Sequence, residues 1–166
     1  TLADLSYLKT NNSGIAVLPI PEVIPFVFSP KELVLILDSI HEPGNLGAII
    51  RMADWYGIKN IICTPDSVDL YNPKVIHSSM GSFTRVHLFY ENVEEFLKKH
   101  PFSEIYGAVL DGQNLHHLNL EPHGALIVGN EVKGISPVVR KFVSLPVSIP
   151  RFGMAESLNV AMAAGI

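Results

Sequence analysis

Apolar and polar residues follow one another along the chain in blocks that predict strands and helices in turn. The run 33–37 is apolar at every position and ends at Asp38, which is typical of a strand covered on both faces. After a turn, Leu46 and Ile50 fall on one stripe of a helix that Gly57 ends. The same reasoning predicts further strands at 59–63, 84–89, 106–110, 125–128 and 144–149, and helices at 46–56, 72–79, 93–99, 137–142 and 156–164.

Strands that alternate with helices require crossover connections, so we expect an α/β fold around a mainly parallel sheet. In such a sheet the strands end along one edge, and ligands bind beyond that edge. The residues directly after each strand are therefore the first candidates for a site. We expect residues 31–166 to form this domain and residues 1–30 to be a lead-in or linker. Because the chain begins with Thr1, we expect a fragment of a longer protein.

The composition is that of one folded domain. Hydrophobic residues make up 48% of the 166 residues and charged residues 17%, which excludes a disordered or low-complexity chain. Twelve Lys and Arg residues against 16 Asp and Glu residues give a formal net charge of -4. This balance argues against a nucleic-acid binder that is basic overall, although it leaves room for a local basic patch.

Cysteine usage and hydropathy indicate the compartment. Cys63 is the single cysteine, so no internal disulfide forms and we expect a reducing environment. The apolar stretch 14–28 contains Glu22 and several prolines, and it is too broken to span a bilayer, which takes about 20 apolar residues. No basic-then-apolar signal sequence precedes it. We therefore expect a cytoplasmic protein without a membrane segment.

The first candidate loop follows the first predicted strand and runs from Glu42 to Arg51. One interpretation is structural: a Pro-Gly turn, Asn45 as a helix cap and Arg51 as a solvated helix residue. The other is that Asn45 and Arg51 meet an anionic or hydroxyl-bearing ligand beyond the strand. Arg51 lies off the apolar stripe of the predicted helix, which leaves it free to do so.

The second candidate loop follows the predicted strand 125–128. Gly129 has no side chain, so the backbone there could approach a ligand closely. The glycine spacing and the Gly-Lys-Ser/Thr ending of a phosphate-binding loop are missing. The alternative is a tight turn that carries Glu131 and Lys133 on the surface.

The third candidate loop, 149–159, leads into a helix of small apolar residues. We expect that helix to be buried or to pack against another subunit. Ser157 and Asn159 then need polar partners, because an unsatisfied buried polar group costs about 1–3 kcal/mol. Capping of the helix by Ser157 would account for one of these residues but not for both.

Several other site types lack their sequence signals. His116 and His117 are adjacent, and no Cys, His and carboxylate residues have the spacing of metal ligands, so we expect no metal. A Gly-x-Ser-x-Gly elbow is absent, as is Gly-x-Gly-x-x-Gly after the first strand. The second absence counts against a Rossmann dehydrogenase or methyltransferase. We interpret Trp55 as a packing or interface residue.

Taken together, the three loops resemble the signature motifs of a known enzyme family. The segments Asn-Leu-Gly-Ala-Ile-Ile-Arg at 45–51, Gly-Asn-Glu at 129–131 and Ser-Leu-Asn at 157–159 stand in a specific order and spacing. They resemble the three motifs of the SpoU/TrmH family of RNA ribose 2′-O-methyltransferases. The resemblance extends over about residues 33–166.

This resemblance implies a SPOUT methyltransferase fold, which is an α/β parallel-sheet fold with a C-terminal trefoil knot. It also implies a homodimer whose active sites lie where the knots of two subunits meet, with S-adenosylmethionine bent inside the knot. The implied reaction is methylation of a ribose 2′-hydroxyl in structured rRNA or tRNA. Family members often carry an N-terminal RNA-binding domain, of which residues 1–30 resemble the tail and linker. They usually continue beyond the point where this chain ends at Ile166, so part of the dimer-forming helix is expected to be missing.

The resemblance also assigns roles to single residues. Arg51 resembles the family's catalytic arginine, and the polar residues that match those holding it and the target ribose are Asn45, Glu131, Ser157 and Asn159. The positions implied to surround the cofactor are Gly129, Ile149 and Leu158, flanked by Asn130 and Met154, with the turn after Leu110 as a further wall.

The implied reaction requires the ribose hydroxyl to lose its proton as it attacks the methyl carbon. A guanidinium has a pKa above about 12 and rarely gives up its proton. We therefore expect Arg51 to stabilise the developing alkoxide and the adjacent phosphate rather than to act as the base. Ser157 is the rival candidate for relaying the proton.

An acidic chain offers few groups for RNA phosphates. The expected phosphate contacts are Arg51, Lys74, Arg85, Lys133, Arg140 and Arg151. Two alternatives remain open at this point. One is a knotted RNA-binding module that has lost catalysis, and the other is a nucleotide-binding α/β domain of unrelated chemistry.

Overall fold

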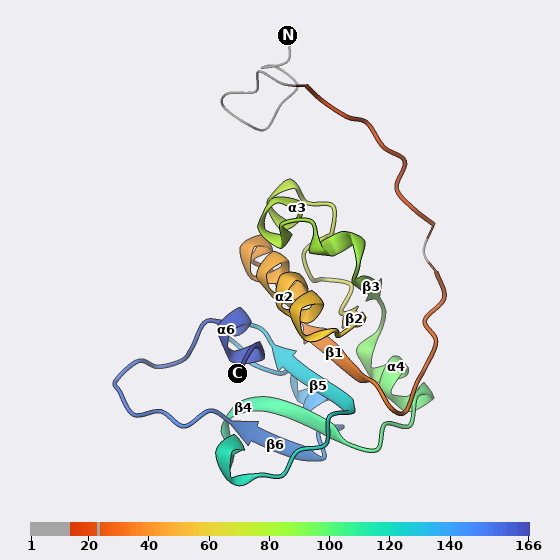
Figure 1. Cartoon of the computed structure of the whole chain (residues 1–166). Helices are drawn as coiled ribbons and strands as arrows, with labels where there is room; N and C mark the ends of the chain where they lie inside the picture. The colour runs from red at the N-terminus through yellow and green to blue at the C-terminus, as the bar shows by residue number, and fades with distance from the viewer. Residues whose placement is uncertain (1–13, 23) are drawn as a thin grey trace.

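The computed structural model describes residues 14–22 and 24–166 (Figure 1). The strands are β1 (Leu33–Asp38), β2 (Asn60–Cys63), β3 (His87–Tyr90), β4 (Ile105–Asn114), β5 (Gly124–Gly129) and β6 (Leu145–Ser148). The helices are α2 (Pro43–Tyr56), α3 (Pro73–Ser79), α4 (Val93–Lys99), α5 (Pro137–Arg140) and α6 (Val160–Ala164), with 3₁₀ turns at Ser82–Thr84 and Leu115–His117.

The six strands form a single sheet in the order β3-β2-β1-β5-β4-β6, and every neighbouring pair is parallel. The α/β fold with a parallel sheet that the sequence predicts is therefore confirmed. The chain moves from β1 out to β3 and then builds the other half of the sheet, with β5 next to β1. Asp38 at the end of β1 is in register with Gly129 at the end of β5. The trefoil knot that the resemblance implies stays a prediction.

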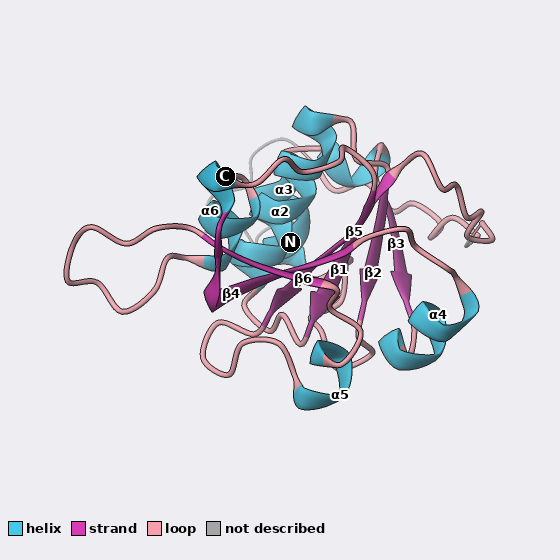
Figure 2. Cartoon of the chain, turned by 90° about the horizontal axis from the view of Figure 1, so that it is seen from below, coloured by secondary structure: helices cyan, strands magenta, loops and turns pink. Residues whose placement is uncertain are grey.

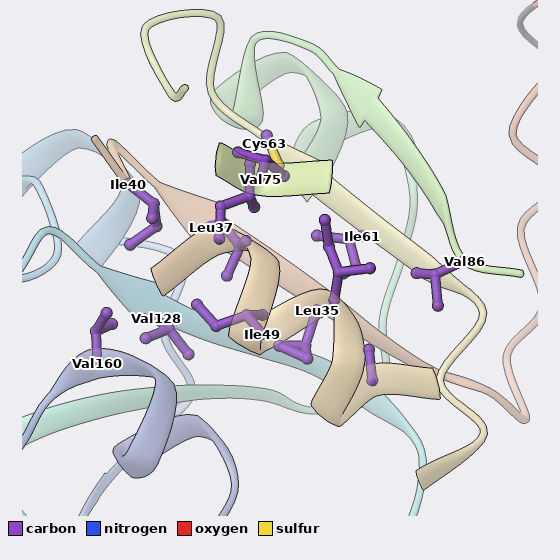
Figure 3. Close-up of a cluster of buried hydrophobic side chains, with 13 residues drawn as sticks. Leu35, Leu37, Ile40, Ile49, Ile61, Cys63, Val75, Val86, Val128 and Val160 are labelled. Carbon is purple, nitrogen blue, oxygen red and sulfur yellow. The ribbon is translucent and has the colours of Figure 1, made fainter. Parts of the chain in front are cut away.

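Helices cover both faces of the sheet (Figure 2). One core cluster lies under α2, α3 and α6, where Leu35, Ile49 and Val75 are among the fully buried residues (Figure 3). The other lies under α4 and α5 and includes Ile36 and Phe96. Burial of one such side chain stabilises the fold by about 1.5–3 kcal/mol, so these two clusters hold the strand ends in fixed positions.

Strand β4 is longer than the sequence indicates. The expected turn at Asp111 and Gly112 lies inside it, because the chain bulges out after Ala108 and pairs with β6 again from Gln113. A Cβ atom on Gly112 would lie 2.5 Å from the backbone of Val147, so glycine permits this close return. The Asp-Gly pair therefore marks a bulge and not the end of the strand.

Strand β3 begins later than predicted, at His87. The residues before it form a 3₁₀ turn, in which Thr84 Oγ1 donates to the carbonyl of Gly81 at 2.9 Å. A local hydrogen bond of this kind competes with strand pairing. The predicted helix at 93–99 is confirmed with the same bounds.

The described part of the lead-in, residues 14–22 and 24–30, contains no helix or strand. Its last part is attached to the domain by aromatic contacts: the ring of Phe26 lies 5.0 Å from that of Phe96, and Phe28 lies 5.1 Å from Phe102. Residues 1–13 of the predicted linker lie outside the described residues. No helix in the part of the chain that the structure describes is long and apolar enough to cross a membrane.

Candidate active site

The segments that follow the strands meet at one edge of the sheet, as their shared direction requires. A cavity of about 780 Å³ opens beside the ends of β1 and β5. Three segments far apart in the chain line it: His41, Glu42 and Asn45 after β1, residues 130–133 after β5, and residues 157–160 at the start of α6. The three loops that the sequence singles out therefore converge on one place.

A chain of hydrogen bonds joins these three segments. Asn159 Nδ2 donates to Asn45 Oδ1 at 2.9 Å, and Asn45 Nδ2 donates to Glu131 Oε1 at 2.8 Å. A carboxylate only accepts hydrogen bonds, so Glu131 fixes the orientation of the Asn45 amide and, through it, that of Asn159. Each loop contributes one member, and the site is held together by polar contacts across up to 114 positions of sequence.

The structural interpretation of Asn45 as a helix cap is wrong. Helix α2 begins at Pro43, three positions before the predicted start, and Glu42 is its cap. The Glu42 carboxylate accepts a hydrogen bond from Gly44 N at 3.3 Å, and Pro43 suits the first helical position because its missing N–H would be unpaired there. Asn45 consequently lies in the first turn of α2, with its side chain available to the cavity.

The turn after β5 is organised by Asn130. Its Oδ1 accepts from the backbone N–H groups of Val132 and Lys133, both at 3.0 Å, and its Nδ2 donates to the carbonyl of Ser39 at 2.8 Å. Asp38, which is buried, accepts from Ser136 N at 2.7 Å at the far end of the turn. The side chain of Asn130 is therefore occupied in building the turn that presents Glu131.

Glycine at position 129 is required by the fold of the turn itself. A Cβ atom there would lie 2.2 Å from the backbone of both Gly134 and Ile135. The missing side chain thus lets the turn fold back on its own strand. Close approach of a ligand at Gly129 stays a prediction.

The closing helix is shorter than predicted. It begins at Val160 instead of Glu156, and Asn159 caps it by accepting from Ala161 N at 3.0 Å and Met162 N at 3.4 Å. Capping by Ser157 is therefore wrong. The expected burial of the two polar residues is also wrong, because Ser157 and Asn159 are both exposed. Ser157 instead lines the cavity with Asn45 and Glu131.

A second cavity, of about 1450 Å³, adjoins the first, and residues of β4, β6 and the segment after β6 are part of its lining. The residues expected around the cofactor that line it are Leu110, Gly129, Asn130, Ile149 and Leu158. Glu131, Ser157 and Leu158 line both cavities, so the two spaces adjoin. Met154 lines neither and is 97% exposed.

Arg51 lies apart from the other candidate residues of its own chain. It is exposed on α2 and lines neither cavity. It lies six positions after Asn45, so the two side chains leave the helix about 120° apart. Among residues 14–22 and 24–166, its guanidinium has no hydrogen bond or ion pair. The role expected for Arg51 stays a prediction.

The basic residues expected to contact phosphate fall into two groups. Three of them are paired with carboxylates: Lys74 with Glu42, Arg85 with Asp54 and Arg140 with Asp111. Each hydrogen bond from the base holds the pKa of its partner carboxyl below the ordinary value. The other three, Arg51, Lys133 and Arg151, form no ion pair with any described carboxylate. A phosphate could pair with these three cations without displacing a carboxylate.

A polar cluster beside the first cavity contains none of the predicted site residues. His41 Nε2 lies 3.3 Å from Asp66 Oδ2, and Ser39 Oγ donates to the same oxygen at 2.7 Å. Ser39 is one of two described non-glycine residues with positive φ, at 62°, and its N–H donates to Thr64 Oγ1 at 2.8 Å. The only sequence signal for this cluster was its position, because Ser39 and Thr64 directly follow parallel strands.

A metal centre finds no support in this region. Within the described residues, no group of three or more His, Cys, Asp and Glu side chains could hold a metal ion.

Comparison with known proteins identifies relatives over most of the chain. The model of the SpoU rRNA methylase family matches residues 32–166. The 23S rRNA (guanosine(2553)-2′-O)-methyltransferase RlmP of Bacillus subtilis is 34% identical over 136 residues, which is 80% of this chain and 55% of that protein. The 23S rRNA (guanosine-2′-O-)-methyltransferase RlmB of Neisseria meningitidis is 35% identical over 142 residues, 83% of this chain and 57% of that protein.

A solved structure of an rRNA methyltransferase is also similar to this chain. The AdoMet-bound rRNA methyltransferase from Sinorhizobium meliloti has a TM-score of 0.75 and 29% identity, over 81% of this chain and 53% of that chain. The chain thus spans slightly more than half the length of each of these three proteins.

Proposed function

The chain belongs to the SpoU rRNA methylase family, and we propose that it transfers the methyl group of S-adenosylmethionine to a ribose 2′-hydroxyl of rRNA or tRNA. The observation that carries the proposal is the hydrogen-bonded chain from Asn159 through Asn45 to Glu131. It joins the three motifs at one cavity, and those motifs are the part of the sequence that resembles the family. The two curated relatives are named for 2′-O-methylation of 23S rRNA guanosine, which is the same class of reaction.

The larger cavity fits S-adenosylmethionine by its chemistry. Its walls include the apolar side chains of Leu110, Ile149 and Leu158, which suit an adenine ring, and the turn at Gly129 offers backbone groups for hydrogen bonds. When bound, this cofactor supplies an electrophilic methyl group on a sulfonium. Asn130 would act by holding the turn, and Met154 would contact the cofactor only if the segment after β6 folds over it.

In this proposal the polar chain orients the ribose. Asn45 and Asn159 are fixed by Glu131 and present their remaining polar atoms to the cavity, while the exposed hydroxyl of Ser157 can bond the ribose hydroxyl. Orientation of two reactants in this way can lower a barrier by about 7–11 kcal/mol in favourable cases. Arg51 would stabilise the negative charge that develops on the ribose oxygen.

We propose that the protein acts as a homodimer. The role proposed for Arg51 requires it to face the ribose, and within its own chain Arg51 lines neither cavity. Trp55 is 84% exposed near the end of the same helix, and Met162 is 63% exposed on α6. The two helices are in contact, because Tyr56 donates from its hydroxyl to the carbonyl of Gly165 at 3.1 Å. Large exposed apolar side chains of this kind mark a protein contact, and a partner bound there would cover the helix that carries Arg51.

The remaining parts of the proposal concern the RNA and the cell. Lys133 and Arg151 line the larger cavity without a carboxylate partner among the described residues, so we propose them, with Arg51, as the main phosphate contacts. Residues 1–30 would link this domain to an RNA-binding domain. A cytoplasmic location agrees with the single cysteine, Cys63, which is buried and has its thiol pKa raised by burial to about 12.

The decisive experiment uses the full-length protein, labelled S-adenosylmethionine and RNA from a strain that lacks the gene. Digestion to nucleosides and mass spectrometry should reveal a 2′-O-methylated nucleoside. If calorimetry shows cofactor binding but no RNA becomes labelled, this reaction is wrong. If the protein binds RNA and not the cofactor, it is an inactive RNA-binding module.

Arg51→Ala tests the assignment of the arginine. We expect cofactor affinity to be unchanged and the single-turnover rate to fall about 10²–10³-fold, as for loss of one charge-stabilising donor. Lys99→Ala is the control, because Lys99 is an exposed cation on α4 that lines neither cavity. An unchanged rate in Arg51→Ala would refute the role given to this residue.

A further inference from the structure

His41 and Asp66 form a pair that the motifs of the family do not include. His41 precedes α2 and lines the cavity that also contains Asn45, Glu131 and Ser157. Asp66 lies in the loop after β2, and its Oδ2 atom is 3.3 Å from His41 Nε2. The pair therefore places an imidazole supported by a carboxylate beside the residues proposed to orient the ribose.

The partner atom fixes the form of the imidazole. An ionised carboxylate can only accept a hydrogen bond, so the proton of neutral His41 lies on Nε2. Asp66 is ionised over the neutral range, because hydrogen bonds from Thr64, Ser39 and His41 outweigh burial and lower its pKa to about 2. Nδ1 of His41 is then left with a lone pair that can take up a proton.

The surroundings hold this pair in place. Ser39, which donates to the same oxygen of Asp66, is itself fixed at three points: its N–H by Thr64, its hydroxyl by Asp66 and its carbonyl by Asn130. These contacts keep it at a φ of 62°, a conformation that a non-glycine residue rarely adopts. The loop that carries His41 is thereby tied to the turn that carries Glu131.

The other polar groups around the cavity already have partners or are not basic. Glu42 is paired with Lys74, which lowers its pKa, and Glu131 accepts from the Asn45 amide. Lys133 is a cation, and a serine hydroxyl such as that of Ser157 is not basic without a partner. Among the described lining residues, His41 is the side chain with an unprotonated nitrogen that can accept the proton of a hydroxyl.

We propose that His41, supported by Asp66, is the base that takes the proton of the ribose 2′-hydroxyl. The hydroxyl proton passes to Nδ1 as the oxygen forms its bond to the methyl carbon. The carbon–sulfur bond breaks with its electron pair going to sulfur, so that the sulfonium becomes a neutral thioether. The imidazolium that results is stabilised by the Asp66 carboxylate, and it loses its proton to solvent before the next turnover.

This inference rests on the proposed methyl transfer, so the test begins with the RNA that the wild-type full-length protein methylates. Single-turnover rates are measured at saturating RNA and cofactor from pH 5 to pH 9 for wild type, His41→Ala and His41→Gln. Glutamine keeps a donor for Asp66 but takes up no proton. His77→Ala, an exposed histidine on α3 that lines neither cavity, is the matched control.

We expect both His41 variants to lose about 10²-fold or more in rate at neutral pH, with unchanged affinities for RNA and cofactor. The wild-type rate should fall as the pH drops, because protonated His41 accepts no proton, and this acidic limb should be missing from the variants. Asp66→Asn should reduce the rate less than the His41 variants do. His77→Ala should behave as wild type.

Two results would overturn the inference while leaving methyl transfer intact. One is an unchanged rate and pH profile in His41→Gln. The other is weaker RNA binding with a salt dependence reduced by about one charge and a normal rate at saturation, which would make His41 a phosphate contact. Failure of the wild-type protein to methylate any RNA would instead refute the proposed function.

Discussion

Two segments leave the same edge of the sheet and are built in opposite ways. The turn 129–136 after β5 is held by three hydrogen bonds of the Asn130 side chain and by Asp38. The segment 151–159 after β6 is exposed at every position. Its internal side-chain bond runs from Arg151 Nη1 to the carbonyl of Ala155 at 3.3 Å. Figure 1 shows it as a long excursion from β6 to α6.

The polar part of the site is therefore fixed by hydrogen bonds, whereas the apolar part lies on an exposed segment. Glu131 and Asn45 are held by hydrogen bonds within the chain, and these contacts offset the cost of ordering the two side chains. Phe152 and Met154, by contrast, are 94% and 97% exposed. We therefore expect the segment 151–159 to gain its contacts when cofactor or a second subunit binds, whereas the turn 129–136 changes little.

The largest difference in unfolding free energy between the two segments should appear when one methyl group is added to a glycine in each of them. In Gly129→Ala the new carbon would lie 2.2 Å from two backbone atoms, and we expect a loss of about 3 kcal/mol or more of unfolding free energy. Gly153→Ala is the control, because nothing lies within 4 Å of its added carbon. Urea denaturation should show little change for Gly153→Ala. Equal losses in the two variants would contradict the comparison.

A smaller loss is expected when the turn keeps its shape but lacks its organising side chain. Asn130→Ala removes the acceptor of two N–H groups and the donor to Ser39, and should cost about 2–3 kcal/mol by chemical denaturation. Asn130→Asp keeps the acceptor and loses only the donor, so it should fall between wild type and Asn130→Ala. An Asn130→Ala variant as stable as wild type would show that the turn does not depend on this residue.

Asp66, which holds His41 and Ser39 beside the first cavity, should make a contribution to the unfolding free energy that depends on pH. The pKa of Asp66 falls from 3.8 to about 2 in the folded protein, mainly through a hydrogen bond from Thr64. A lowered folded-state pKa stabilises the fold above pH 3.8, and this contribution disappears as the pH falls to about 2. Because the Asp66 side chain is 58% exposed, solvent screening limits the effect to under about 1 kcal/mol. Asp66→Asn should narrow the stability difference between pH 6 and pH 2.

The smallest effect on stability is expected in the exposed segment. Met154→Ala should change the unfolding free energy by less than about 0.5 kcal/mol without cofactor. Trypsin should cut after Arg151 readily in the free protein and slowly with S-adenosylmethionine, and Met154→Ala should weaken that protection. Cleavage at the same rate with and without cofactor would show that the segment does not close over it.

The sequence by itself determined the alternation of elements and the identity of the polar residues at the site. The buried runs at β1 and β5 could be recognised because a parallel strand is apolar on both faces. Asn45 and Glu131 became candidates because they follow those runs, and Asn159 because it is polar within a predicted apolar helix. The resemblance to the family's motifs then selected all three. Helix ends were harder to predict, since Glu42 and not Asn45 caps α2, and Asn159 and not Ser157 caps α6.

Only the tertiary structure decided which of these residues meet. Asn159 reaches Asn45 across 114 positions of sequence, and Asp66 reaches His41 across 25. A hydrogen bond forms between side chains that the sheet brings within about 3 Å, and periodicity carries no information about such distances. For the same reason the structure separated Arg51 from the cavity that its motif shares, because a helix turns through about 100° per residue and directs neighbours in one motif to different faces.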